Sequence, residues 1–153
     1  MHSFKETRIM RHDADIIEQI IMDVEKYPEF LPWCSAASIL EQDDNSMIAL
    51  LEISFKGFKE NYKSKVKKDA NSDGCQISVD AISGPFRYLK NVWNIKELEN
   101  GVEVIFSIDF EFKSTILDMI VGVIFSTAAK KMIAAFENRA NSLCKTIGKK
   151  NLV

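Results

Sequence analysis

The sequence predicts an α+β fold in which a curved antiparallel sheet of about six to seven strands wraps around one long C-terminal helix. The stretch from Thr115 to Lys145 contains no proline and no cluster of turn residues, so at ~1.5 Å per residue it predicts a helix of roughly 45 Å. Before it, short segments of alternating apolar and polar residues are separated by turn sequences, which is typical of antiparallel strands. A large antiparallel sheet twists and curls, and this helix is long enough to cover its apolar face.

Length and composition limit the classes of protein to which the chain can belong. Its 153 residues predict one domain, residues 1–153, and 46% hydrophobic residues with ten Phe are sufficient for a large core. A formal charge of −2 argues against bulk attraction to nucleic acid, so DNA is not an expected partner. The N-terminal residues lack the apolar segment of a signal peptide, and Cys34, Cys75 and Cys144 form no CxxC pair. Reduced thiols in a cytoplasmic protein are therefore expected.

The N-terminal part of the chain predicts one strand and two short helices. Ser3–Arg11 alternates between apolar and polar residues, which indicates a strand. Asp13 is a typical N-cap for an amphipathic helix that ends near Glu25. Pro28 and Pro32 then bracket a single turn of helix, because proline suits the first position of a helix and stops a helix that it follows. This turn contains the apolar residues Phe30, Leu31 and Trp33.

Six further segments predict a meander of antiparallel strands. They are Ala37–Gln42, Met47–Gly57, Lys59–Ala70, Cys75–Ser83, Arg87–Leu98 and Val102–Lys113. The last two flank Asn100-Gly101, a strong hairpin signal because both residues tolerate positive φ. The last segment alternates along its whole length, so one face of the sheet is predicted to be apolar and the other solvated.

The C-terminal helix is regularly amphipathic only in its second half. From Ala129 onward, apolar residues recur at steps of three and four. In the first half the same face presents small residues such as Gly122, and Ile116–Phe125 is apolar nearly all round. Either the helix bends near Gly122 or the small residues border a cavity. The apolar run Ile116–Ala129 is about 14 residues, shorter than the ~20 that span a bilayer, so a soluble protein is expected.

Signals for catalysis are weak. The sequence contains no metal-ligand spacing, phosphate-binding loop or GxSxG motif, so neither a metal nor an enzyme is expected. His2 lies near the terminus, and His12 precedes a helix with no cysteine or nucleophile motif nearby, so both are expected to be ordinary surface histidines. Asp80 and Asp109 lie within predicted strands. A paired-carboxylate role is one interpretation, but their polar neighbours favour solvent exposure.

One predicted strand has a strong charge bias. Its lysines face a single acid, Glu60, and four of them lie on one side of the strand. The lysines of this region are Lys56, Lys59, Lys63, Lys65, Lys67 and Lys68. A solvated strand face is one interpretation, and an anionic partner such as RNA phosphates or lipid headgroups is the other. Aromatic residues are limited to Tyr62, so base stacking is not indicated.

Four motifs resemble one known family. They are Tyr27-Pro28-Glu29-Phe30-Leu31-Pro32-Trp33-Cys34, Gly84-Pro85-Phe86 with Leu89 and Trp93, Phe110-Glu111-Phe112-Lys113-Ser114, and Phe136-Glu137-Asn138-Arg139-Ala140. Together they are similar to the coenzyme Q-binding START-like proteins of the polyketide cyclase/dehydrase superfamily. This superfamily has the helix-grip fold and also contains the bacterial ribosome-association toxin. The resemblance spans essentially the whole chain.

The resemblance implies non-enzymatic binding of ubiquinone or a related polyprenyl lipid in a cavity between sheet and helix, in support of respiratory electron transport. The quinone would be a bound ligand and not a catalytic cofactor. A cytoplasmic protein in peripheral contact with the inner membrane face is the matching expectation. The alternative with the same resemblance is a toxin that binds the large ribosomal subunit and inhibits subunit association.

The predicted ligand-binding residues have two origins. The family motifs imply roles for Tyr27, Pro28, Phe30, Leu31, Pro32, Trp33, Gly84, Pro85 and Phe86. The residue pattern adds Phe106, Phe110, Ile116, Met119 and Gly122 as lining. Trp33 and Trp93 have a second interpretation, as residues that simply fill the core. The candidate surface for an anionic partner consists of Lys56, Lys59, Lys63, Lys65 and Lys67.

Overall fold

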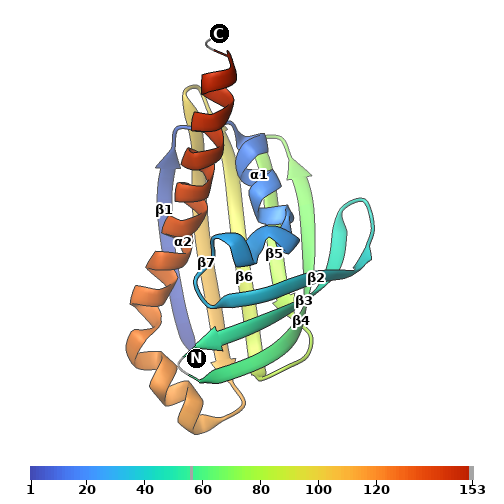
Figure 1. Ribbon diagram of the computed structural model, residues 1–153, viewed down its shortest axis with the longest axis vertical. Coiled ribbons are helices and arrows are strands. Elements are labelled where there is room, and N and C mark those ends of the chain that lie inside the picture. The colour runs from blue at the N-terminus through green and yellow to red at the C-terminus, as the bar shows by residue number, and fades with distance from the viewer. Residues whose placement is uncertain (56, 152–153) are drawn as a thin grey trace.

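The computed structural model describes residues 1–55 and 57–151, with side chains described to Cys144. The strands of these residues form one antiparallel sheet in the order β1-β7-β6-β5-β4-β3-β2, and α2 lies along its concave face (Figure 1). The elements are β1 (His2–Met10), α1 (Ala14–Met22), the 3₁₀ helix η1 (Val24–Glu29), β2 (Cys34–Gln42), β3 (Ser46–Phe55), β4 (Phe58–Asn71), β5 (Gly74–Ala81), β6 (Phe86–Leu98), β7 (Gly101–Phe112) and α2 (Thr115–Asn151). This arrangement confirms the predicted α+β fold with its curved sheet and long C-terminal helix.

The sheet follows the apolar and polar alternation of its sequence. In β7 every second side chain from Val102 to Phe112 is buried, while the residues between them are partly exposed. The hairpin from β6 to β7 turns at Glu99-Asn100, one residue before the predicted Asn100-Gly101, and Gly101, which pairs with Leu98, has a φ of 151°. A Cβ at Gly101 would lie 2.5 Å from the carbonyl oxygen of Met10, so the end of β1 can approach this turn only because the residue is glycine.

The short helix after α1 begins earlier than the sequence predicted. It is a 3₁₀ helix from Val24 to Glu29 that includes Pro28, rather than one turn bracketed by Pro28 and Pro32. The carbonyl of Tyr27 accepts hydrogen bonds from the N–H groups of Phe30 and Leu31, so Pro28 occupies the first position of this final turn, where no N–H is needed. The chain leaves the helix after this turn because Leu31 precedes Pro32, and a residue before proline disfavours the helical backbone.

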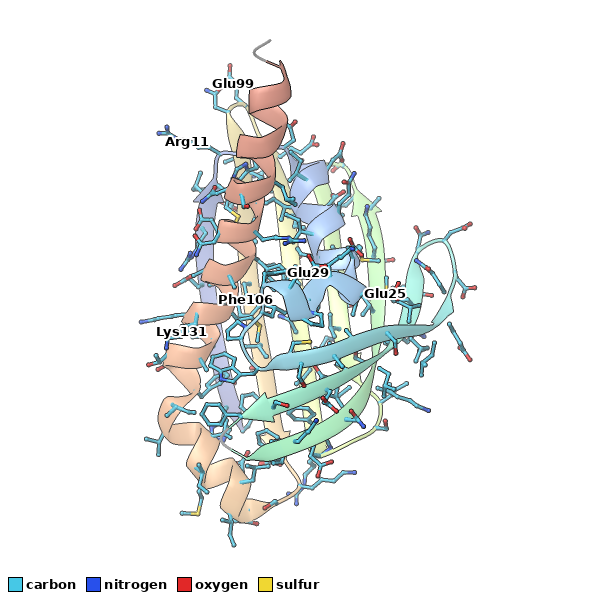
Figure 2. All side chains as sticks on the ribbon, viewed as in Figure 1. Arg11, Glu25, Glu29, Glu99, Phe106 and Lys131 are labelled. Atoms are coloured by element: carbon cyan, nitrogen blue, oxygen red, sulfur yellow. The ribbon has the colours of Figure 1, made fainter. Side chains whose placement is uncertain are left out.

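The second half of α2 fills the core against the sheet. Ile133 and Phe136 are buried, and the Phe136 ring lies edge-to-face on Trp93 of β6 at 4.7 Å between centroids. Phe106 is opposite Trp93 on the neighbouring strand β7 and packs edge-to-face on it at 4.8 Å between centroids, and Figure 2 shows its side chain between α2 and the sheet. The polar face of the same helix, including Lys131, points away from the sheet (Figure 2).

The first half of α2 is exposed along one side. The helix is continuous from Thr115, but its ribbon bends in its first part (Figure 1). Ile116 is 74% exposed and Val123 86%, whereas Phe125 points inward and is buried. Gly122 does not face a cavity, because a Cβ there would lie 2.6 Å from Cε1 of His2 on β1.

Polar contacts fix the start of α2 to β7 and β1. The backbone N–H of Phe112 donates to Oδ1 of Asp118 at 2.9 Å, and this bond holds the pKa of the Asp118 carboxyl below its ordinary value. His2 lies 3.1 Å from the same carboxylate and packs its ring on Phe110 and Phe125. These contacts of Asp118 therefore fix the position of the first turn of α2, which bears exposed apolar side chains.

By length and composition, Thr115–Cys144 is the one stretch among the described helices that could cross a membrane. It is longer than Ile116–Ala129, the run on which the expectation of a soluble protein was based. A core helix of a soluble protein has the same properties, and Ile133, Phe136 and Ala140 are buried in this one.

Two isoleucines of α2 provide a matched test of this packing. Ile133 is completely buried, so Ile133→Ala should lower the free energy of unfolding by about 2–5 kcal/mol. Ile116 is 74% exposed, so Ile116→Ala should change it by less than about 0.5 kcal/mol. Urea denaturation of the two variants gives both values. Equal losses would contradict the described orientation of the helix.

Candidate functional site

A cavity of about 400 Å³ lies between the sheet, the segment that follows η1 and the first half of α2. This volume lies within the range of roughly 300–1,000 Å³ that small-molecule sites occupy. The lining residues of the sheet are Cys34, Leu51, Glu52, Ile53, Phe55, Phe58, Tyr62, Ser64, Val66, Val79, Phe86, Leu89, Asn91, Trp93, Ile108, Phe110 and Phe112, and the Glu52 carboxylate among them is bonded to Ser35 and Lys59. The opposite wall consists of Tyr27, Leu31, Pro32 and Trp33 after α1, and of Leu117, Ile120, Val121, Ile124, Phe125, Ala128, Ala129, Met132 and Phe136 on α2.

The polar groups of this apolar lining are mostly satisfied or neutral. Asn91 donates from Nδ2 to the carbonyl of Ser107 at 2.8 Å and accepts at Oδ1 from Trp93 Nε1 at 2.9 Å. The Tyr27 hydroxyl donates to the carbonyl of Ile21. Burial raises the pKa of both the Tyr27 and the Tyr62 hydroxyl, so neither ionises near neutral pH. The cavity therefore suits an uncharged, largely hydrocarbon ligand.

Trp33 forms part of the wall in an uncommon backbone conformation. Its φ is 64°, in the left-handed region that non-glycine residues seldom adopt. Its carbonyl accepts a hydrogen bond from Ser54 N–H at 2.9 Å, and its ring lies edge-to-face on Phe55 at 6.1 Å. These contacts on β3 hold the residue against a local cost of roughly 1–3 kcal/mol, and they point its ring to the cavity.

The cavity reaches the surface beside α2. Ile120 lines it and is also 57% exposed. Ile116, Met119 and Val123 surround Ile120 on the same helix and are more exposed still. We call these four residues the apolar rim. A contiguous exposed apolar surface of this kind is typical of a binding or membrane-contact site.

Six of the predicted ligand-binding residues line the cavity, and eight do not. Those that line it are Tyr27, Leu31, Pro32, Trp33, Phe86 and Phe110. Those outside the lining are Pro28, Phe30, Gly84, Pro85, Phe106, Ile116, Met119 and Gly122. That any of them binds a ligand stays a prediction.

Local packing explains why these residues lie elsewhere. Phe106 is fully buried beside Trp93, and Phe30 packs on Phe136 beneath the Arg139 guanidinium. Ile116 and Met119 belong to the exposed rim, and Gly122 faces His2. Gly84 has a φ of 107° in the loop before β6, and a Cβ there would lie 2.5 Å from Cβ of Tyr62.

The part of the wall formed by β4 and β5 was not predicted from the sequence. Tyr62, Ser64 and Val66 of β4 and Val79 of β5 line the cavity. The signal was present in β4, because these three residues alternate with lysines and must point to the opposite face of the sheet. Only the outer, lysine-bearing face of β4 was interpreted from the sequence, and its inner face was not.

On that outer face, charges alternate from strand to strand. Lys65 of β4 is opposite Asp80 of β5, which is opposite Lys90 of β6, which is opposite Asp109 of β7. Lys90 therefore separates the two aspartates, and this register agrees with the solvent-facing interpretation rather than with a carboxylate pair.

The predicted lysine surface is only partly free of ionic partners. Lys59 lies 3.6 Å from Glu52, and Lys67 lies 3.9 Å from Asp69. Lys68 is half-buried and bonded to Glu18 at 3.1 Å. The exposed lysines of β4 on the outer face are Lys59, Lys63, Lys65 and Lys67, and we call the last three the lysine row. Lys56 lies outside the described residues.

His12 has a partner that the sequence did not predict. Its Nδ1 lies 3.1 Å from Sγ of Cys144, which is 132 residues later in the chain, and its Nε2 lies 2.6 Å from Oδ1 of Asn141. The expectation of a histidine without a nearby cysteine was therefore wrong, because α2 returns to the start of α1. Among the described residues, no group of three His, Cys, Asp or Glu side chains could hold a metal ion.

An antiparallel sheet wrapped around one long helix, with an apolar cavity between them, defines a START-like protein of the helix-grip class. The family model described as polyketide cyclase/dehydrase and lipid transport matches residues 19–137, and the chain belongs to this family. A solved structure of a STAR-related lipid transfer protein from Xanthomonas axonopodis superposes with a TM-score of 0.82 over 91% of this chain and 85% of its own, at 14% identity. That likeness concerns the fold.

Two named relatives are similar over nearly the whole chain. The ribosome association toxin RatA of Rickettsia prowazekii is 40% identical over 95% of this chain and 100% of its own length. The mitochondrial coenzyme Q-binding protein coq10 of Schizosaccharomyces pombe is 30% identical over 92% of this chain and 87% of its own. The resemblance expected from the four sequence motifs is thus confirmed for both branches.

Proposed function

We propose that the protein is a non-enzymatic carrier that binds a hydrophobic ligand of the polyprenyl quinone class in its cavity. The observation that supports this proposal most directly is the cavity of about 400 Å³ with its apolar and aromatic lining. The relative named for coenzyme Q binding supports the choice of ligand class. Burial raises the pKa of the Cys34 thiol in the lining to about 11, and no group of three His, Cys, Asp or Glu side chains among the described residues could hold a metal ion, which favours binding over turnover.

The energetics of such a site need no charged anchor. Each methylene group transferred from water into an apolar cavity contributes about 0.8 kcal/mol, so a few isoprene units offset the cost of immobilising the ligand. Asn91 and Tyr27 are already bonded within the protein and remain so when a hydrocarbon chain lies beside them. Affinity would thus depend on the apolar area that the ligand buries.

The apolar rim suggests how such a ligand enters. A polyprenyl quinone resides in the bilayer, and the cavity reaches the surface between exposed apolar side chains of α2. We infer peripheral contact of this rim with the inner membrane face by a protein that is otherwise cytoplasmic. Contact of apolar side chains with the interface would let the ligand move without crossing water.

The cavity can be tested by filling it from the sheet. Val79 points into the cavity from β5, so Val79→Phe should abolish binding of a short-chain ubiquinone. Ser78→Phe adds the same ring on the outer face of the same strand and should bind normally. Native mass spectrometry and the thermal shift on adding the quinone provide the readout. Absence of binding by the unmodified protein, or equal binding by both variants, would refute the proposal.

A second candidate function is docking on the large ribosomal subunit, which would hinder subunit association. The 40% identity to a protein named as a ribosome association toxin favours it. The lysine row supplies three exposed charges on the outer face, away from the cavity. Cavity and lysine row lie on opposite faces of β4, so one chain could possess both functions.

Ribosome docking through the lysine row should be sensitive to salt and charge. Simultaneous Lys63→Glu, Lys65→Glu and Lys67→Glu should remove co-sedimentation with large subunits at low salt, because rRNA phosphates would repel the reversed charges. Lys113→Glu, Lys130→Glu and Lys131→Glu change the net charge equally on another surface and should leave it intact. Protein that stays at the top of the gradient at every salt concentration would exclude this function.

A further inference from the structure

One hydroxyl in the cavity wall lacks a hydrogen-bond partner among the described residues. Ser64 of β4 is 1% exposed, lines the cavity, and its Oγ has no acceptor or donor within reach. Its cross-strand neighbours are Ala49 on β3 and Ala81 on β5, whose side chains have no polar atom to offer. The Asn91 side chain, by contrast, is bonded on both sides. Among the described residues, Ser64 Oγ is thus the one fully buried side-chain nitrogen or oxygen atom without a partner.

An unpaired hydroxyl at this depth is costly. A buried polar group without a partner destabilises a protein by about 1–3 kcal/mol, and folded proteins contain few of them. Alanine or valine would fill this inward position of β4 without that cost, as Val66 does two residues later. A ligand atom that bonds Oγ would remove the penalty only in the bound state, and the penalty would then favour binding.

We propose that Ser64 Oγ is the hydrogen-bond anchor for the polar head of the ligand. The ligand would place one carbonyl or hydroxyl oxygen beside Ser64 and its hydrocarbon tail along α2, toward the apolar rim. Because a serine hydroxyl both donates and accepts, it fits a quinone carbonyl and also the hydroxyl of the reduced quinol. This inference rests on the proposed carrier function and specifies the chemistry of its ligand: an apolar chain with an oxygen-bearing ring at its inner end.

The test compares two ligands that differ in their oxygens. Decylubiquinone and decylbenzene share a ring and a ten-carbon chain, but decylbenzene has no hydrogen-bonding atom. Ser64→Ala should lower the affinity for decylubiquinone about three- to tenfold and leave the affinity for decylbenzene unchanged, as measured by isothermal titration calorimetry. Ser78→Ala, on the outer face of β5, is the matched control and should alter neither.

The outcomes separate this inference from the function on which it rests. If the unmodified protein binds neither compound, the carrier function fails. If both compounds bind but Ser64→Ala affects them equally, or affects neither, the carrier function stands and the anchor is refuted. The ligand-free Ser64→Ala variant should unfold at the same temperature or higher, because the unpaired hydroxyl is gone; a marked loss of stability would also contradict the anchor.

A second inference concerns a cluster at the other end of α2. Cys144 Sγ lies 3.1 Å from His12 Nδ1, and His12 Nε2 lies 2.6 Å from Asn141 Oδ1. The Asn141 oxygen only accepts, so Nε2 carries the ring proton and Nδ1 is left to accept from the thiol. Cys144 is thus hydrogen-bonded to a base, His12, which Asn141 orients, and this is the arrangement that activates cysteine nucleophiles in enzymes.

The geometry points to Cys144 as a reactive thiol that soft electrophiles modify. With iodoacetamide, the sulfur forms a bond to carbon, iodide leaves, and His12 takes the thiol proton before passing it to water. The other two thiols provide internal references. Burial raises the pKa of Cys34 to about 11 and that of Cys75 to about 12, so both stay protonated and slow.

Alkylation rates in the folded protein test this assignment. Peptide mass spectrometry after brief treatment with iodoacetamide should show Cys144 labelled at least about tenfold faster than Cys34 or Cys75. His12→Ala should slow the alkylation of Cys144 about tenfold, although this substitution exposes the sulfur. Arg11→Ala, at the neighbouring position, should leave that rate unchanged. If access alone governed the reaction, His12→Ala would speed it up. That result, or equal rates for Cys144 and Cys34, would overturn the inference.

Discussion

The contact between Phe136 of α2 and Trp93 of β6 sets the distance between helix and sheet on which the rest of the structure depends. The two rings meet edge-to-face at 4.7 Å, and Tyr27 and Phe30 of the segment after α1 pack on the same Phe136 at 5.4 and 5.2 Å. Three elements are thereby joined at one ring. On one side of it α2 is packed tightly, and on the other side the sheet curves away and the cavity opens.

The cavity follows from a mismatch between the two surfaces. The inner face of the sheet is apolar along several strands, and the single helix α2 is too narrow to cover all of it. Part of the apolar surface of α2 also faces outward, at Ile116 and Val123. A protein interior of this size would ordinarily be filled to crystal-like density. Apolar surface that is left uncovered on both the sheet and the helix is what a site for a hydrocarbon ligand requires, and the bond from Phe112 to Asp118 attaches the first turn of α2 beside that space.

The order of the strands and the long helix could be predicted because each depends on local sequence, as in the alternation of β7 and the Asn100-Gly101 pair that marks the hairpin to within one residue. The cavity wall could be predicted only in part. Trp33 belonged to a family motif, but Ser64 acquires its meaning from Ala49 and Ala81, which lie beside it only after the strands pair. Likewise, no local pattern could place Cys144 next to His12 across 132 residues. The length of α2 and its direction over the sheet decide that contact.

The contact of Gly122 with His2 has an evolutionary consequence. Any larger side chain at position 122 must move the imidazole, whose Cε1 would lie 2.6 Å from the new Cβ, and moving it separates His2 from Asp118. Substitutions at 122 and at 2 are therefore not independent: each decides which residues the other position tolerates. Among homologues the two positions should covary although one begins the first strand and the other lies in the last helix, and a chain that alters only one of them should lose the contact between His2 and Asp118 while the bond from Phe112 to Asp118 remains.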